Sequence, residues 1–117
     1  MSELSSESIK RGLKTDLIGQ NIVYYPSLGS TNELLKELAA QGAPEGTLII
    51  ADEQTVGKGR LGRKWLAPSG TSLLMSLLFR PNLAPNQAPR LTMICSLAMA
   101  DAIEELTGLP VGLKWPN

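Results

Sequence analysis

The 117 residues, 43% of them hydrophobic, suffice for one small globular domain or for a piece of a larger one. Eleven Lys and Arg balance 11 Asp and Glu, which argues against bulk electrostatic binding to nucleic acid or to an anionic membrane. The single cysteine, Cys95, and the lack of histidine exclude an intrachain disulfide and argue against the usual histidine-based metal and acid–base sites, so we expect no bound metal in the protein itself.

We expect no secretory signal in the first residues. Polar and acidic residues 2–8 follow Met1 in place of a basic run and an apolar core, and no apolar stretch approaches the ~20 residues that a spanning helix needs. A lone cysteine suits a reducing compartment. We therefore expect a cytoplasmic protein with no membrane partner.

The N-terminal part predicts a short helix and then a strand. Residues 5–13 fit one or two helical turns with Gly12 near their end, within a connector that we extend over residues 1–20. Residues 22–25 are β-branched and aromatic, and we predict a strand that is stopped by Pro26.

A clear helix start follows. Ser30 and Glu33 match the capping box, in which the serine hydroxyl accepts the third helical N–H and the glutamate reaches back to the cap. Gly42 is the predicted end. The apolar stripe of this helix consists of Leu34, Leu35 and Leu38.

The middle of the chain predicts two strands around a long loop. Residues 47–51 form an apolar run before Asp52 and Glu53, which suggests a buried strand that delivers its carboxyl end to a site. Residues 54–70 are glycine-rich and show neither helical nor alternating periodicity, and a loop of that size is usually functional or mobile. Residues 72–79 resume as an apolar strand.

The C-terminal part predicts a packed helix and a final strand. A turn at Pro85 and Pro89 precedes residues 90–106, which have helical spacing, and Gly108 is the expected stop. Residues 111–115 begin another strand.

The most informative motif is the basic segment 57–65, which places four cations among three glycines with no carboxylate. Glycines let the backbone approach a ligand closely, and Arg60 and Arg63 can fork onto phosphate or carboxylate oxygens. The segment indicates an anion-binding loop. A solvated basic loop is the alternative, because charge runs are common on protein surfaces.

Two familiar nucleotide-binding motifs are matched only in part, because the residues around them do not fit. Gly57, Gly59 and Gly62 satisfy the bare dinucleotide pattern, but they do not open a helix directly after a strand. The phosphate-loop pattern fails because Arg63 and Lys64 replace its Lys-Ser/Thr pair.

Three motifs occur in the order seen in biotin protein ligases, and the sequence resembles that family from about residue 9 to its last residue. The motifs are Ser30-Thr31-Asn32 before a helix, Gln54 ahead of the glycine–arginine loop, and Lys114-Trp115-Pro116-Asn117. The resemblance implies an α/β fold, a mixed sheet with packed helices, and it implies that residues 21–117 are the amino-terminal part of a catalytic domain related to class II aminoacyl-tRNA synthetases and lipoate ligases.

The resemblance also implies the reaction. Biotin, the substrate, would be activated by ATP, with Mg²⁺ in the substrate complex, to biotinyl-5′-adenylate. It would then be transferred to a lysine of the biotin carboxyl carrier protein of acetyl-CoA carboxylase. No tightly bound cofactor and no nucleic acid partner are expected, and a homodimer is left open.

The family pattern assigns roles to residues at matching positions. Loop closure would let the catalytic cations stabilise charge on the α-phosphate. Ser30 has an alternative as a helix cap worth about 1 kcal/mol, and Trp65 has one in packing. The implied catalytic residues are Arg60, Arg63 and Lys58; the biotin-binding residues are Ser30, Thr31, Asn32, Gln54, Gly57 and Trp65; the nucleotide-binding residues are Gly59, Gly62, Lys114 and Asn117.

The chain departs from the family pattern in two ways. Lys58 stands where the family loop most often has arginine, which exchanges a planar fork for a single ammonium group. The family motif continues with an aspartate after the position of Asn117, and a further lysine follows. We therefore expect this chain to hold the biotin-recognition and adenylate-loop half of an incomplete site, without repressor activity.

Two rival interpretations remain. A lipoate or octanoate ligase shares the fold and the adenylation chemistry, but a hydrophobic substrate would not need the polar set of Ser30, Thr31 and Gln54. A noncatalytic module could bind RNA or another polyanion through its basic loop. Zero net charge and five aromatic residues weaken this second alternative.

Overall fold

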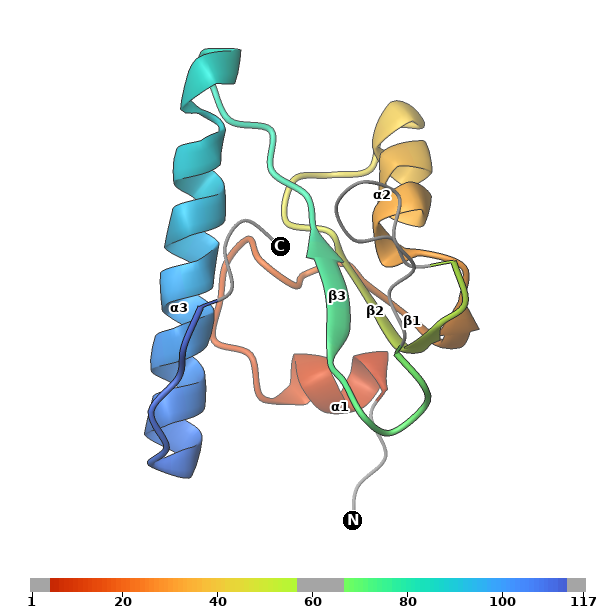
Figure 1. Cartoon of the computed structure of the whole chain (residues 1–117). Helices are drawn as coiled ribbons and strands as arrows, with labels where there is room; N and C mark the ends of the chain where they lie inside the picture. The colour runs from red at the N-terminus through yellow and green to blue at the C-terminus, as the bar shows by residue number, and fades with distance from the viewer. Residues whose placement is uncertain (1–4, 57–66, 114–117) are drawn as a thin grey trace. The chain divides into compact units, whose positions relative to one another are not determined.

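A computed structural model describes residues 5–56 and 67–113. The chain forms two compact units, Met1–Arg80 and Pro81–Asn117. In Figure 1 the first unit contains a small sheet with the helices α1 and α2, and the second contains the long helix α3. The predicted class, a mixed α/β fold, is confirmed.

The sheet is built around one buried strand. Its order is β1 (Ile22–Leu28), β2 (Leu48–Gln54) and β3 (Leu74–Leu77), with β1 parallel and β3 antiparallel to β2. The apolar half of β2 is the core of this unit, since Ile49 and Ala51 have no exposed surface. Such a continuous apolar run is typical of a strand covered on both faces.

Several predicted strand ends are wrong, and the strand expected over residues 72–79 is limited to β3, Leu74–Leu77. β1 continues past Pro26, and its register with β2 extends to the pair Leu28 and Gln54. In the described sheet β1 has a partner on one side only, and a proline whose missing N–H faces away from that partner costs no ladder bond. This longer pairing also carries β2 three residues past its predicted end at Ala51.

Helix α2 (Thr31–Ala40) begins and ends as predicted. The Ser30 hydroxyl accepts the N–H of Glu33 over 3.3 Å, which is the first half of the capping box. The Glu33 carboxylate, expected to reach back to the cap, lies 3.6 Å from Lys36 Nζ. Gly42 follows the last turn with a φ of 94°, the left-handed conformation that glycine adopts most easily.

The first helix is confirmed as well. α1 (Ser6–Arg11) is preceded by Ser5, whose side chain accepts the N–H of Ser8 over 3.0 Å, while the Ser8 hydroxyl accepts the N–H of Ser5 over 3.0 Å. This reciprocal capping box stabilises the first turn of a helix that is too short to be stable alone. Gly12 is its C-cap.

In the second unit, the 3₁₀ turn η2 (Pro85–Gln87) leads into α3 (Pro89–Thr107). Gly108 ends α3 as predicted, with a φ of 72° and its N–H donated to the Glu104 carbonyl over 2.7 Å. The predicted strand 111–115 is wrong for residues 111–113, because the Val111 N–H donates to the Glu104 carboxylate over 2.9 Å and not to a strand.

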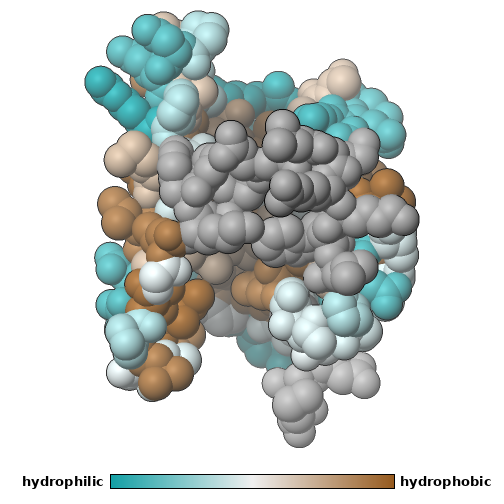
Figure 2. Space-filling view, viewed as in Figure 1, coloured by the Kyte–Doolittle hydropathy of each residue, from teal (hydrophilic) through white to brown (hydrophobic). Residues whose placement is uncertain are grey.

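Within its own unit the apolar stripe of α3 is not fully covered, and the packed helix expected from the sequence stays a prediction. Ile94 and Leu97 are 62% and 55% exposed, and brown apolar surface follows this helix in Figure 2. The described part of its unit, residues 81–113, contains no strand against which these side chains could be buried. In the described chain, no helix is long and apolar enough to cross a membrane.

Candidate functional site

Two predicted site residues meet where β2 ends and α2 begins. The Thr31 N–H donates to Gln54 Oε1 over 2.8 Å, and the Thr31 hydroxyl lies 3.1 Å from the same oxygen. The parallel register explains the contact: β1 and β2 run side by side up to Leu28 and Gln54, and β1 then leads directly into Ser30 and α2. The sheet therefore joins residues that lie 23 positions apart.

The strand β3 adds a third residue to this group, and this residue was not predicted from the sequence. Ser76 of β3 has its hydroxyl oxygen 2.9 Å from Thr31 Oγ1 and 3.1 Å from Asn32 Oδ1. A polar residue within the apolar strand Leu74–Leu77 was the available signal. We call these four residues the Thr31 cluster: Thr31, Asn32, Gln54 and Ser76.

The Thr31 cluster is a neutral, hydrogen-bonded site. Thr31 is 4% exposed, and its hydroxyl is satisfied by Gln54 and Ser76, as a buried hydroxyl must be. Asn32 is exposed and Gln54 is half-buried, so two carboxamides border solvent beside a fixed threonine. Such a set can exchange hydrogen bonds with an uncharged polar ligand, since carboxamides offer both donors and acceptors.

Ser30, another predicted biotin residue, lies directly before this cluster. Its hydroxyl accepts the Glu33 N–H, so the alternative of a helix cap is confirmed. A serine hydroxyl keeps a proton and a second acceptor position after it accepts one bond. A ligand role for Ser30 therefore stays a prediction that is compatible with the cap.

The segments flanking the glycine–arginine loop are held beside the same end of β2. On one side, the Thr55 and Val56 N–H groups donate to the carbonyls of Leu28 and Gly29 over 3.0 and 2.8 Å. On the other side, Ala67 forms a bridge with Gln54. The remaining predicted site residues lie outside the described residues: Gly57, Lys58, Gly59, Arg60, Gly62, Arg63, Trp65, Lys114 and Asn117.

Asp52 fixes the second of these flanks. Its carboxylate accepts the Ser69 hydroxyl, and it accepts the Gly70 N–H over 3.0 Å. These two hydrogen bonds, with Ser69 the larger cause, lower the pKa of Asp52 below its ordinary value of 3.8, because both favour the charged carboxylate.

The lowered pKa predicts a pH-dependent attachment of this flank. Because the pKa of Asp52 is lowered in the folded state, its hydrogen bonds contribute to the free energy of unfolding. This contribution is fully present above the ordinary pKa of 3.8 and is lost as pH falls through the folded-state pKa. In an NMR pH titration the Gly70 amide signal should move with a midpoint below 3.8, and Asp52→Asn should abolish this transition. A Gly70 signal that moves equally in both proteins would contradict the hydrogen bond between Gly70 and Asp52.

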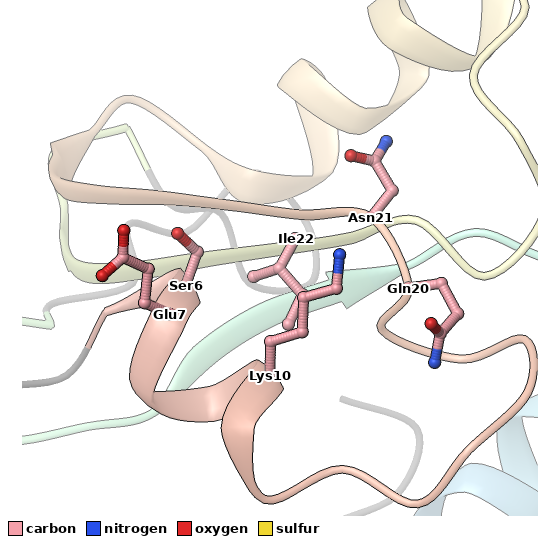
Figure 3. Close-up of a pocket in the computed structure, with 6 residues that line it drawn as sticks. All are labelled: Ser6, Glu7, Lys10, Gln20, Asn21 and Ile22. Carbon is pink, nitrogen blue, oxygen red and sulfur yellow. The ribbon is translucent and has the colours of Figure 1, made fainter.

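A separate shallow pocket lies between α1 and the start of β1. Figure 3 shows Lys10 and Ile22 at its centre, with the Asn21 carboxamide pointing away. None of the predicted site residues that the structure describes lines it, and we connect it with no part of the chemistry inferred from the sequence. The described residues that line it are Ser6, Glu7, Lys10, Gln20, Asn21 and Ile22.

The mixed sheet with a polar cluster at the end of its central strand defines a small α/β domain, and comparison with known proteins identifies its family. A model of the biotin/lipoate A/B protein ligase family matches residues 24–117. The chain belongs to this family.

Individual relatives agree with this assignment. The bifunctional ligase/repressor BirA of Bacillus subtilis is 43% identical over 115 residues, which cover 98% of this chain and 35% of that protein. The biotin–[acetyl-CoA-carboxylase] ligase of Mycobacterium tuberculosis is 36% identical, over 92% of this chain and 44% of that protein. The chain thus spans less than half of the length of these relatives.

A solved structure is similar over most of the chain. The biotin protein ligase from Aquifex aeolicus, determined in complex with biotin and ATP, matches with a TM-score of 0.69 and 41% identity. The match covers 84% of this chain and 40% of that one. The fold expected from the family resemblance is therefore confirmed.

Proposed function

We propose that this chain provides the biotin-recognition part of a biotin protein ligase, with the Thr31 cluster as its binding site. The observation that carries the proposal is the neutral set of carboxamides and hydroxyls fixed at the end of β2. Membership of the ligase family supports it, as do the relatives whose names state biotin ligase activity.

The chemistry of the cluster fits the ureido ring of biotin. That ring has one carbonyl acceptor and two N–H donors and carries no charge. Gln54 Oε1 already accepts hydrogen bonds from Thr31, so the Nε2 end of this carboxamide is available to donate to a ureido carbonyl. A site built to satisfy such a polar group rejects ligands that lack it, because its own groups would then be unpaired.

The proposed reaction has two balanced steps. A carboxylate oxygen of biotin attacks the α-phosphorus of ATP, the bond to the β-phosphate oxygen breaks, and pyrophosphate leaves. The amine of an acceptor lysine then attacks the acyl carbonyl, an amide forms, AMP leaves and the amine loses a proton. The proposed acceptor is the biotin carboxyl carrier protein.

We assign the second half of this site to positions outside the described residues. Arginine forks suit an α-phosphate that gains charge, and a glycine-rich backbone suits close approach to the nucleotide. ATP would arrive with Mg²⁺ as the substrate complex. The proposed catalytic residues are Arg60, Arg63 and Lys58, with Gly57 and Trp65 near biotin and Gly59, Gly62, Lys114 and Asn117 near the nucleotide.

The domain assignment follows from this function. Residues 21–117 would be the amino-terminal part of the catalytic domain, and residues 1–20 would be a connector. We place the reaction in the cytoplasm because Cys95 is a free cysteine, which suits a reducing compartment.

The main rival within the family is a lipoate or octanoate ligase, because the matching family includes lipoate ligases. Its substrates present an apolar chain, whereas the Thr31 cluster presents polar groups. This difference favours biotin over a lipoyl substrate.

Calorimetric titration tests the proposal. We expect a nonhydrolysable biotinyl-adenylate mimic to bind saturably and its lipoyl equivalent to bind at least about tenfold more weakly, the size of effect expected when polar groups are left unpaired. Arg60→Ala should weaken binding of the biotinyl mimic, while Arg90→Ala, which removes an exposed cation of α3, should leave it unchanged. Equal binding of both mimics would contradict the proposed substrate, and no binding by the folded chain would contradict the proposed site.

A further inference from the structure

Three side-chain contacts in the Thr31 cluster require a hydroxyl proton, but only two hydroxyl groups take part. The contacts are Thr31 Oγ1 with Gln54 Oε1 at 3.1 Å, Thr31 Oγ1 with Ser76 Oγ at 2.9 Å, and Ser76 Oγ with Asn32 Oδ1 at 3.1 Å. Thr31 and Ser76 carry one hydroxyl proton each. One of the three contacts must therefore receive its proton from another group.

The carboxamide of Asn32 can supply this proton. A half turn about its last side-chain bond exchanges Oδ1 and Nδ2, which have nearly the same shape. Asn32 is exposed, so the turn disturbs no packing. Nδ2 then donates to Ser76, Ser76 donates to Thr31, and Thr31 donates to Gln54. In this arrangement each hydroxyl donates once and accepts once.

We propose that Ser76 is a positioning residue of the biotin site. Its hydroxyl accepts a hydrogen bond from Asn32 and donates one to Thr31, so all hydrogen bonds of the cluster run in one direction. The inference rests on the proposed function. The serine is well placed for the task because β3 is paired directly with the central strand, in a register that sets Ser76 opposite Ile49. Its neighbours Met75 and Leu77 have no hydroxyl that could replace it.

The direction of the chain determines which groups remain for a ligand. Gln54 Oε1 is occupied by the N–H and the hydroxyl of Thr31, so Gln54 offers the donors of Nε2. Asn32 donates through Nδ2, so it offers the acceptor Oδ1. One donor group and one acceptor group, held in fixed orientations, match the carbonyl and an N–H of a ureido ring. Without Ser76 the Asn32 carboxamide could turn, whereas Gln54 Oε1 would still accept the Thr31 N–H.

The first test uses NMR on the unliganded chain. In Ser76→Ala and in Ser76→Cys, a weaker hydrogen-bonding group of similar size, the side-chain amide signals of Asn32 should move toward those of a free carboxamide, because Asn32 is the carboxamide that contacts Ser76. Ser76→Thr should keep the wild-type signals because it keeps the hydroxyl. Ser96→Ala, which removes a hydroxyl bonded within α3, is the matched control. Unchanged signals in folded Ser76→Ala and Ser76→Cys would overturn the inference.

The second test measures biotin affinity in the same proteins. Loss of one hydrogen bond that orients the site predicts an increase in the Kd of Ser76→Ala by about fivefold to tenfold, with Ser76→Thr within about twofold of wild type. An unchanged Kd in Ser76→Ala would overturn the positioning role. If the wild type bound no biotin while the carboxamide signals still moved in Ser76→Ala, the hydrogen-bond chain would stand and the proposed function would fail.

Discussion

Biotin is expected to bind Thr31→Val about tenfold to a hundredfold more weakly than it binds the wild-type chain. Valine keeps the shape of threonine and the main-chain N–H that donates to Gln54, but it lacks the hydroxyl that contacts Gln54 and Ser76. Because Thr31 is 4% exposed, water cannot readily replace the lost partner. Both neighbouring polar groups would lose a hydrogen bond, and the Gln54 carboxamide would lose a constraint.

Calorimetry of Thr31→Val beside Thr31→Ser checks this result. The serine variant keeps the hydroxyl and loses a methyl group, so it should bind biotin much more tightly than the valine variant. Thermal unfolding shows whether both variants fold. Equal biotin affinity for the valine variant and the wild type would exclude the Thr31 hydroxyl from the site.

Gly46→Ala is expected to destabilise the first unit by about 2–4 kcal/mol, the sum of left-handed backbone strain and a steric clash. Gly46 has a φ of 89°, and a Cβ atom there would lie 2.2 Å from the carbonyl oxygen of Leu17. The Gly46 N–H also donates to Leu78 over 2.8 Å, and its carbonyl accepts the Gly19 N–H over 2.9 Å. The backbone around it is thus held on two sides and cannot move away easily.

Gly42→Ala separates the two causes. Gly42 has a similar φ of 94°, but a Cβ atom there would meet nothing within 4 Å. The free energy of unfolding of Gly42→Ala should fall only by the cost of the left-handed backbone strain, about 1–2 kcal/mol. Denaturant unfolding gives both free energies. If the two variants were equally stable, the close approach of Leu17 to Gly46 would not exist in solution.

The elements that the sequence predicted correctly are those with local signals. Ser30 as a cap and Gly42 and Gly108 as terminators are properties of a few neighbouring residues, and the structure confirms all three. The strand ends at Pro26 and Ala51 were wrong because they depend on which strand lies at the edge and on how far the partner continues. Strand order and partner length belong to the tertiary structure, which a few neighbouring residues do not determine.

The same distinction applies to the site. Thr31, Asn32 and Gln54 were predicted from a family resemblance, and the parallel register explains how Thr31 and Gln54 come together. Ser76 was missed because it lies 45 residues from Thr31, and one serine in an apolar strand does not indicate its partner. Its role becomes visible only when the hydroxyl protons of the cluster are counted.

The most direct test of the account is an NMR titration of the isotope-labelled chain with biotin, read at the Thr31 amide and the Gln54 side-chain amide. We predict saturable shifts at both groups and at Ser76, with no comparable change on addition of lipoic acid. Absence of shifts in the Thr31 cluster of the folded chain, or shifts confined to the pocket between α1 and β1, would contradict the claim that this cluster recognises biotin.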